Sequence, residues 1–533
     1  MRGSVSTDLM SPAHPVRRSL TLEELGANVD EERKRLLSDG DRPFDDDDGL
    51  GDEDNVPPVS YWARYRRIVL VTTSLLVSLI FAIVFLPTLA GLVYPSPRPS
   101  ADFNSRRLRS NGTHDFRKTA LIVSIDGLRA DYLDRGLTPH LLDIAKKGLR
   151  AKSMKPIFPT LTFPNHWALM TGLYAESHGI VGNNFWDPET EKEFLYSSID
   201  SAWDSSWWLG QPMWETAEQA GIITANLMWP GPPTTMTGAS PTYFVPWKDK
   251  VPLQEKLDQI VAWIDLPLDE RPQLIMAYEP SLDQAGHLAG PASELVNKVL
   301  HNVDVFAKDL HSVLEARNLT DIVDIVFVSD HGMTDTSNPE HIYIDDILGE
   351  GFSMIEHEDG WPSMGLRFRP EADDEKYLNI LLAAAKASGG KFAVYTHNTM
   401  PERYHFAHNY RISPIYVVPR MGYVLTNRIE NGTGMSKGNH GYDNSEPSMQ
   451  AMFVAHGPFS AVVKAVEQSR TKGHILPRFL SRPNKGWHST ADDTFVMDAF
   501  ENVNIYNLMM KLVGIEEHAA HTNGTKGFWD KYF

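Results

Sequence analysis

The chain has 533 residues, a net charge of −19 and no cysteine, so disulfides and thiolate metal sites are excluded. The negative charge argues against stable binding of a nucleic-acid duplex. It does not exclude a small phosphate substrate, because a metal cluster can dominate the local field. Hydrophobic residues make up 42% of the chain, which is enough for a large core. Because the chain has no cysteine, any transition metal must be held by histidine and carboxylate side chains.

The first 67 residues are dominated by charged and small residues, including the block Asp45–Asp48. We expect residues 1–67 to form a disordered acidic tail on the cytosolic side. Within it, residues 32–37 (ERKRLL) resemble an acidic dileucine signal for a sorting adaptor. A short amphipathic turn is the alternative interpretation of this stretch.

Residues 68–94 contain no charged side chain and are long enough to span a bilayer. The run lies too far from the start for a cleavable signal peptide, so we expect a transmembrane signal-anchor helix. All four glycosylation acceptors follow it: Asn111, Asn318, Asn431 and Asn523. This pattern predicts a single-pass type II membrane protein whose C-terminal part is luminal or extracellular. The sequence does not choose between the plasma membrane and a vacuole- or lysosome-like compartment.

Proline, serine and arginine in residues 95–117 indicate a stalk, and the folded part is expected over residues 118–533. This part alternates apolar β-branched runs with helical patterns. Strands are expected at 119–125, 222–227, 273–278 and 321–328, and helices at 137–147, 209–220, 252–264, 292–316 and 504–512. The alternation predicts an α/β fold, with a mostly parallel central sheet, helices on both faces and a smaller insertion within 343–422.

Acidic residues follow three of these strands. Asp126 comes directly after the first, Asp283 shortly after the third, and Asp330 after the fourth. In open α/β sheets, ligands bind outside the carboxyl ends of the strands. A single aspartate in such a place is often only a cap or a turn former, but the joint placement predicts one polar crevice.

Histidines accompany these carboxylates. His287 lies four residues after Asp283, His331 follows Asp330, and His440 lies in the glycine-flanked stretch Gly438-Asn-His-Gly. Three aspartates and three histidines suit two Zn²⁺ ions, or another pair of divalent ions. Paired metals are the usual device for in-line displacement at phosphorus.

A hydroxyl between two prolines completes the set. Thr162 lies in residues 158–166 (FPTLTFPNH), ahead of an expected helix at 167–172. The prolines stiffen the backbone around it. The start of a helix also favours an anion. Taken alone, these signals favour a helix cap for Thr162, with a hydroxyl held beside a bound anion as the alternative.

These motifs occur together in one order: Asp126-Gly127, Thr162–His166, His178–Asn183, Asp283-x-x-x-His287, Asp330–Met333 and Gly438-x-His440-Gly441. In this order they resemble the nucleotide pyrophosphatase/phosphodiesterase (type I phosphodiesterase) family of the alkaline phosphatase superfamily. The resemblance spans residues 121–442, and residues 502–509 are similar to the end of the family's domain.

The resemblance implies an alkaline-phosphatase-like fold and a two-zinc site. One zinc would be held by Asp126, Thr162, Asp330 and His331. The other would be held by Asp283, His287 and His440. Thr162 would be the nucleophile and would form a covalent threonine intermediate.

The resemblance also implies a substrate site. Asn183 would bind a non-bridging phosphate oxygen. Phe163 would form one wall of a nucleobase slot, with Tyr243, Phe244 or Trp247 as a second wall. His166 is interpreted as a packed residue or one that supports a ligand.

The expected reaction is hydrolysis of nucleoside triphosphates, dinucleotides or oligonucleotide ends to nucleoside 5′-monophosphates. Leu161 and Asn184 stand where many family members have basic residues, so a preference for a triphosphate tail is in doubt. An alternative is a phosphodiesterase acting on lipid or choline phosphodiesters. A third hypothesis is an inactive membrane receptor or sorting protein, which would require damaged metal ligands.

Overall fold

The computed structural model describes residues 107–432, 435–464, 487–490 and 494–533. The chain divides into two compact units, Met1–Ser96 and Pro97–Phe533, and every described residue belongs to the second unit. The predicted tail, the predicted transmembrane helix and the first part of the stalk lie outside the described residues. Among the residues that are described, no helix combines the length and the apolar character that a membrane crossing requires.

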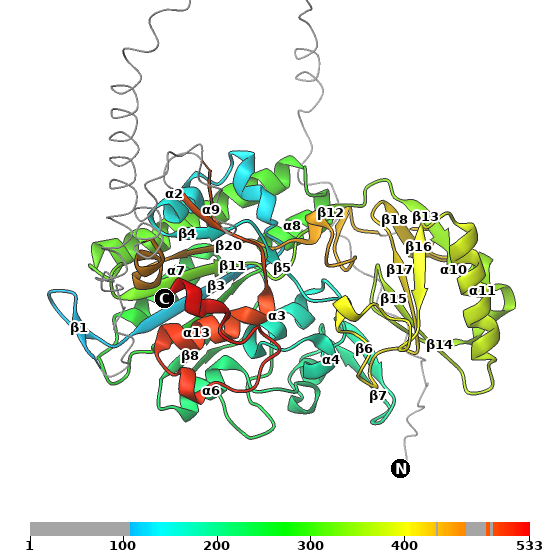
Figure 1. The fold of residues 1–533 in the computed structure, drawn as a ribbon, viewed down its shortest axis with the longest axis horizontal. Helices are drawn as coiled ribbons and strands as arrows, with labels where there is room; N and C mark the ends of the chain where they lie inside the picture. The colour runs from blue at the N-terminus through cyan, green and yellow to red at the C-terminus, as the bar shows by residue number, and fades with distance from the viewer. Residues whose placement is uncertain (1–106, 433–434, 465–486, 491–493) are drawn as a thin grey trace, which may run out of the picture. The chain divides into compact units, whose positions relative to one another are not determined.

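A nine-stranded sheet forms the centre of this unit (Figure 1). Its spatial order is β21 (Trp487–Thr490), β22 (Thr494–Met497), β4 (Leu149–Ala151), β20 (Phe453–His456), β11 (Val323–Val328), β3 (Thr119–Ile125), β10 (Leu274–Glu279), β8 (Thr224–Leu227) and β9 (Tyr243–Val245). The strands β11, β3, β10, β8 and β9 run parallel to one another, whereas β20 pairs antiparallel with β11. The predicted mostly parallel α/β sheet is confirmed.

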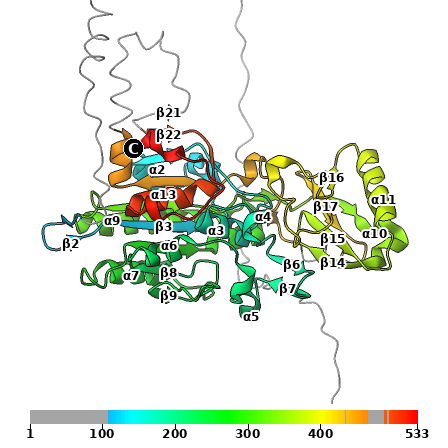
Figure 2. The same ribbon diagram turned by 60° about the horizontal axis from the view of Figure 1, so that its bottom comes forward.

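The strands β3, β10 and β11 are buried along their whole length. Their unbroken apolar sequences, such as TALIVSI in β3, suit strands covered on both faces. One core cluster joins one face of these strands to α2 (Pro139–Lys147), α7 (Leu253–Ile264), α8 (Ser281–Ala289) and α9 (Glu294–Ala316). A second cluster joins the other face to α3 (Thr162–Thr171), α6 (Met213–Gln219) and α13 (Ile505–Val513). Figure 2 shows these helices around the sheet.

Several predicted boundaries differ from the structure, and two of the differences have a clear cause. The helix expected over 209–220 begins only at Met213, because Gly210 has a φ of +85° and Pro212 occupies the N-cap. The folded part also begins before residue 118. The strands β1 (Arg109–Ser110) and β2 (Asp115–Phe116) form a hairpin, and Phe116 is buried beneath the guanidinium of Arg271. Part of the predicted stalk therefore belongs to the folded unit.

The predicted insertion forms a second, smaller sheet with its own core. Its antiparallel strands are β14 (Ile355–Asp359), β15 (Met364–Phe368), β17 (Ile415–Pro419) and β16 (Phe392–Tyr395), accompanied by α10 (Ile344–Leu348) and α11 (Asp374–Ala387). The parallel pair β13 (Glu340–Tyr343) and β18 (Tyr423–Thr426) frames the insertion. The inserted sheet lies beside the main sheet in both ribbon views (Figures 1 and 2).

Short elements complete the described part. They are β5 (Met154–Lys155), α4 (Ala175–His178), β6 (Asn184–Asp187), β7 (Lys192–Leu195), α5 (Ile199–Ala202), β12 (Thr334–Asp335), β19 (Gly438–Asn439) and β23 (Phe500–Glu501).

A buried ion pair fixes the insertion to the hairpin β6–β7. The Arg411 Nε donates to Asp187 Oδ2 at 2.9 Å, and its Nη1 donates to the carbonyls of Gly179 and Trp207 at 3.0 and 2.7 Å. Both charged side chains are buried, so the backbone acceptors matter as much as the ion pair. The insertion is thereby attached to the segment that follows Asn183.

Asp324 of β11 is buried, and its Oδ1 accepts the N–H of Phe459 at 2.7 Å. Burial raises the pKa of this carboxyl from 3.8 to about 7. Because the folded-state pKa is raised, its contribution to stability is fully present below about pH 4 and is lost as the pH rises through about 7.

Asp324→Asn is therefore expected to flatten the pH dependence of the unfolding free energy. Between about pH 6 and about pH 8 the wild type should lose about 1 kcal/mol more than the variant, since one pKa unit corresponds to about 1.4 kcal/mol. Denaturant unfolding at the two pH values measures this difference. The control is Asp143→Asn, at an exposed position of α2. Equal pH slopes for wild type and Asp324→Asn would contradict the prediction.

Candidate active site

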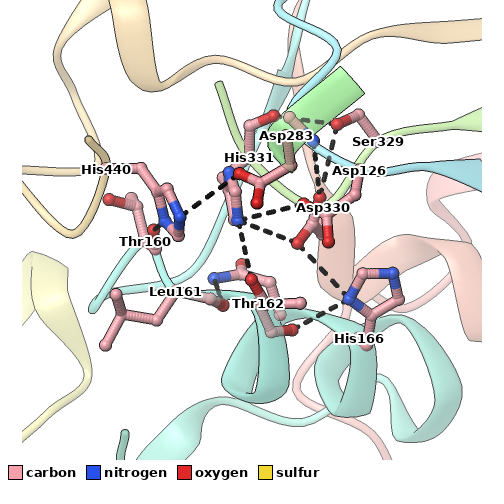
Figure 3. Close-up of polar contacts among 12 residues, drawn as sticks. Asp126, Thr160, Leu161, Thr162, His166, Asp283, Ser329, Asp330, His331 and His440 are labelled. Carbon is pink, nitrogen blue, oxygen red and sulfur yellow. Dashed lines mark hydrogen bonds and ion pairs between the residues drawn. The ribbon is translucent and has the colours of Figure 1, made fainter. Parts of the chain in front are cut away.

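The acidic residues predicted at the strand ends converge because their strands are neighbours in the sheet. Asp126 follows β3, Asp330 and His331 follow β11, and α8 begins two residues after β10. One helical turn separates Asp283 from His287 on α8, so both lie on the same side of the helix. Figure 3 shows the carboxylates and imidazoles gathered around one centre.

The hydroxyl of Thr162 reaches this centre from α3. Thr162 is the first residue of the helix and Leu161 is the N-cap, so the interpretation of Thr162 as a cap is wrong. Its Oγ1 lies 3.2 Å from His331 Nε2 instead. At this helix end the N–H of Phe163 donates to Asn183 Oδ1, Pro164 has none, and the N–H of Asn165 donates to the Leu161 carbonyl. These three residues do not contribute to the expected anion site, which stays a prediction for the N–H of Thr162.

Asn165 holds the loop before Thr162 in place, a role that the sequence did not suggest. Its Oδ1 accepts the N–H of Ile157 at 2.8 Å, and its Nδ2 donates to the carbonyls of Pro159 and Leu161 at 3.0 and 2.9 Å. The side chain is fully buried. Side-chain hydrogen bonds, together with the prolines, therefore fix the Thr162 backbone.

Two groups of candidate metal ligands share Asp283. The first is Asp283, His287 and His440, and the second is Asp126, Asp283 and His331; within each group the ligand atoms lie within 4.8 Å of one another. His440 Nε2 lies 3.0 Å from His287 Nε2 and 3.4 Å from Asp283 Oδ1. The rings of His331 and His440 stack with centroids 3.6 Å apart. Thr162 and Asp330 adjoin the second group through His331 (Figure 3).

Backbone carbonyls orient the three histidines. The Nδ1 atoms of His287, His331 and His440 each lie 2.8 Å from a carbonyl oxygen, of Gly438, Gly332 and Thr160 respectively. A carbonyl only accepts, so each Nδ1 carries a hydrogen and each Nε2 faces the centre, where its lone pair is available to a metal ion when the ring is neutral. This is the arrangement that metal-binding histidines adopt. The facing Nε2 atoms of His287 and His440 repel each other unless a cation lies between them.

The carboxylates have bare oxygens on the same side. Asp126 Oδ1, Asp283 Oδ1 and Asp330 Oδ2 are buried and accept no hydrogen bond within the described part of the chain. Each faces an imidazole nitrogen at 3.0 to 3.4 Å, and a buried carboxylate is costly unless a cation balances its charge. Three such oxygens and three imidazole nitrogens form a donor set that suits Zn²⁺. The residues present therefore fit a pair of divalent metal ions.

The pKa shifts of the aspartates and histidines in this cluster show that burial and neighbouring charges act strongly on them. Burial, with Asp330 and Asp283 nearby, raises the pKa of Asp126 well above its usual value. Burial opposes ionisation of Asp330, but the imidazoles of His331 and His166 hold its pKa well below the usual value. Burial and the adjacent His331 and His287 lower the pKa of His440. A divalent cation would relieve the repulsion among the carboxylates.

Two neighbouring residues support the site. Thr160 Oγ1 donates to the Tyr442 carbonyl and accepts the N–H of Gly441, so it links the Thr162 and His440 loops. His166 Nδ1 donates to the Thr162 carbonyl at 2.9 Å and lies 3.3 Å from Asp330 Oδ2. His166 contacts both the nucleophile's backbone and a predicted ligand, so its interpretation as a supporting residue stays a prediction.

Next to Thr162 lies an aromatic surface. The ring of Phe163 is 5.5 Å from that of Tyr196 and also contacts Phe194 and Trp208. Tyr196 is 43% exposed, and its N–H donates to the carbonyl of Asn183. The sequence analysis missed Tyr196, whose only signal is its place in the hairpin that begins with Asn184.

The other predicted site residues are characterised by their exposure and packing. Trp247 is 53% exposed, and Phe244 packs against Trp203; their part in a base slot stays a prediction. Asn318, Asn431 and Asn523 are exposed and Asn111 is half-buried, and their glycosylation also stays a prediction.

Comparison with known proteins agrees with this fold and site. Residues 120–443 match the family described as type I phosphodiesterase / nucleotide pyrophosphatase. The fold and the site define an alkaline-phosphatase-like α/β hydrolase. The chain belongs to the type I phosphodiesterase/nucleotide pyrophosphatase family.

Its relatives include fungal and mammalian proteins. An uncharacterized pyrophosphatase/phosphodiesterase of Schizosaccharomyces pombe is 38% identical, covering 81% of this chain and 90% of that protein. Ectonucleotide pyrophosphatase/phosphodiesterase 1 of Saccharomyces cerevisiae is 30% identical, covering 96% and 70%. Human family member 1 is 32% identical over 76% of this chain, but this covers only 41% of the human protein.

Solved structures of murine ectonucleotide pyrophosphatase/phosphodiesterase 5 are similar throughout the folded part. One is 30% identical with a TM-score of 0.65, covering 77% of this chain and 98% of that chain. Another, an inactive threonine-to-alanine variant in complex with AMP, is 29% identical with a TM-score of 0.64 and the same coverage.

If the histidines hold metal, Zn²⁺ should raise the thermal midpoint of chelator-treated protein. A ligand at 100 times its Kd stabilises by about 2.7 kcal/mol. His287→Ala should lose most of this rise, because it removes one imidazole from the group with Asp283 and His440. The control His341→Ala changes a histidine that contacts Tyr343 instead and should keep the rise. An equal rise in both variants would contradict the assignment. Differential scanning fluorimetry measures the midpoints.

Proposed function

We propose that this protein is a two-zinc nucleotide pyrophosphatase/phosphodiesterase that yields nucleoside 5′-monophosphates through a covalent threonine intermediate. The observation that carries the proposal is the set of bare ligand atoms beside Thr162. Three Nε2 lone pairs and three carboxylate oxygens face one centre, and the Thr162 hydroxyl lies 3.2 Å from His331. The family supports the reaction class, and the AMP complex of the murine structure supports a nucleotide ligand.

The chain supplies two sets of residues for the metals. Asp126, Thr162, Asp330 and His331 would hold one Zn²⁺, and Asp283, His287 and His440 the other. When bound, the two ions would supply Lewis acidity and lower the pKa of the attacking hydroxyl. Asp283 lies between the two sets and neighbours both.

Thr162 acts as the nucleophile in this proposal. Its Oγ1 attacks phosphorus, the bond to the leaving oxygen breaks, and a phosphate ester of Thr162 forms. Water then cleaves this ester and restores the hydroxyl. The inactive threonine-to-alanine variant of the murine structure supports an essential threonine in that relative.

Asn183 orients the substrate phosphate. Its Oδ1 is occupied by the N–H of Phe163, so its Nδ2 is the group left to donate to a phosphate oxygen. Phe163 and Tyr196 present adjoining rings beside this position, which suits stacking of a nucleobase. Trp247 remains a candidate for the opposite wall.

Two uncharged residues beside the site, Leu161 and Asn184, bear on the choice between nucleotide and other phosphodiester substrates. Leu161 is buried beside Thr162, and Asn184 is half-buried after Asn183. Neither supplies a positive charge for a triphosphate tail. Lipid or choline phosphodiesters therefore remain the second candidate. An inactive receptor is disfavoured, because all six ligands are present and converge.

We also propose that the catalytic part lies in the lumen or outside the cell. The uncharged run 68–94, as a signal-anchor helix, and the four acceptor asparagines beyond it support this placement. The dileucine-like stretch 32–37 would be the contact for a sorting adaptor.

Thr162→Ala should abolish hydrolysis of p-nitrophenyl thymidine monophosphate, with a loss of at least about a thousandfold in kcat, because the nucleophile is absent. The matched control is Thr171→Val, at the far end of α3, where the hydroxyl donates to the Trp167 carbonyl and accepts the N–H of Leu173. Its kcat should stay near that of the wild type. Full activity in Thr162→Ala would overturn the mechanism.

Phe163→Ala should raise KM for nucleotide diesters about tenfold or more, because one stacked base is worth about 1–3 kcal/mol. Tyr196→Ala should raise it in the same direction. Turnover of p-nitrophenyl methyl phosphate, which has no base, should change little. A glycerophosphodiester assayed in parallel tests the hypothesis of a lipid or choline phosphodiesterase. Faster turnover of this substrate than of nucleotide diesters, with no change of KM in Phe163→Ala, would favour that hypothesis.

A further inference from the structure

Tyr278 is the second-to-last residue of β10. It contacts Asp126, a predicted metal ligand that follows the neighbouring strand β3. Its hydroxyl donates to Asp126 Oδ2 at 2.5 Å, and its side chain is buried. The other oxygen of Asp126, Oδ1, accepts no hydrogen bond within the described residues and lies 3.4 Å from His331 Nε2. The two oxygens of Asp126 therefore differ: Oδ2 accepts a hydrogen bond from Tyr278, and Oδ1 is left to face a metal ion.

The position of Tyr278 is itself tightly held. The buried Lys256 donates from Nζ to the Tyr278 carbonyl at 2.9 Å and to Glu279 Oε2 at 2.6 Å. The His166 ring packs edge-on against the Tyr278 ring, with centroids 4.8 Å apart. The backbone and the ring are thus constrained on separate sides, so the hydroxyl stays directed at Asp126.

The two oxygens of Asp330 also differ in their hydrogen bonds, but other donors cause the difference. Its Oδ1 is approached by the N–H of Gly127 at 3.3 Å and by Ser329 Oγ at 3.4 Å, while its Oδ2 is bare. Among the described residues, the Tyr278 hydroxyl is the one side-chain hydrogen-bond donor to Asp126, at a much shorter distance. Removing that one group would leave Asp126 free to rotate or to chelate with both oxygens.

We propose that Tyr278 is a positioning residue that limits Asp126 to a single metal-facing oxygen and thereby sets the affinity of this site for its divalent cation. The inference rests on the proposed two-metal site. Groups that hydrogen-bond to metal ligands typically change metal affinity by about 10- to 100-fold when removed.

The test is Tyr278→Phe in the full chain, with the Zn²⁺ dissociation constant measured by competition with a chromophoric chelator. We expect binding about 10- to 100-fold weaker than in the wild type. The matched control is Tyr506→Phe, which removes a buried hydroxyl bonded to Thr216 and to the N–H of Ala520. Its zinc affinity should be unchanged. Unchanged affinity in Tyr278→Phe, or an equal loss in Tyr506→Phe, would overturn the inference.

Activity then separates this inference from the proposed function. Saturating Zn²⁺ should restore kcat of Tyr278→Phe to within a few-fold of the wild type, whereas Thr162→Ala should remain inactive at any zinc concentration. A weaker Zn²⁺ affinity in Tyr278→Phe, with a wild type that hydrolyses no phosphodiester, would overturn the proposed function but not the role of Tyr278.

A second variant covers the case in which Tyr278→Phe fails to fold. 3-Fluorotyrosine placed at position 278 keeps the shape and the hydroxyl, and makes that hydroxyl a stronger donor. Zinc affinity should then equal or exceed that of the wild type. A tenfold loss with this residue, in a protein whose metal-free thermal midpoint is unchanged, would overturn the inference.

Discussion

The mutual repulsion of three carboxylates, two buried and one half-buried, is the constraint on which the rest of the site depends. Asp126, Asp283 and Asp330 meet because β11, β3 and β10 are adjacent parallel strands whose carboxyl ends open on the same edge. Burial alone would protonate such a cluster or drive it apart. The surrounding structure opposes this by occupying one oxygen of Asp126 and of Asp330 with donors and by placing imidazoles opposite the bare oxygens.

The scaffold orients ligands from distant segments through backbone groups. Each histidine is set by one carbonyl, and the carbonyl that orients His440 belongs to Thr160, two residues before Thr162. The hydroxyl of Thr160 also holds the N–H of Gly441. The loop that presents the hydroxyl and the loop that presents the last histidine therefore stabilise each other. Asp443, three residues after His440, accepts two hydrogen bonds from the Arg403 guanidinium.

Much of the fold and of the candidate site could be predicted from local pattern. The strand at 119–125 has the same bounds in the structure, because an unbroken β-branched run has no alternative to a strand buried on both faces. The grouping of Asp126, Asp283, Asp330 and the histidines followed from strand ends and spacing. The start of α6 and the extent of the stalk were misjudged, because a positive-φ glycine and a long-range hairpin contact decided them.

Other features were beyond the sequence. Thr162 looked like a helix cap, but Leu161 holds that position and the hydroxyl faces His331. The helix start was predicted to favour an anion, but Asn183 occupies the N–H of Phe163 and Pro164 has none, so only part of that helix end is open to one. Asn165, Tyr196 and Tyr278 carried no motif, since their importance lies in partners far away in the chain.

By itself, the sequence determined the fold class and predicted the metal-ligand types, because hydrophobic periodicity and residue chemistry are local properties; the family resemblance predicted the nucleophile. Only the tertiary structure decided which oxygen of each carboxylate is bare, which nitrogen of each histidine faces the centre, and which aromatic ring adjoins Phe163. These outcomes depend on hydrogen bonds and contacts between segments, many of them more than 100 residues apart, such as Tyr278 with Asp126 and His440 with Thr160. A linear pattern does not encode such partners, because they are chosen by packing.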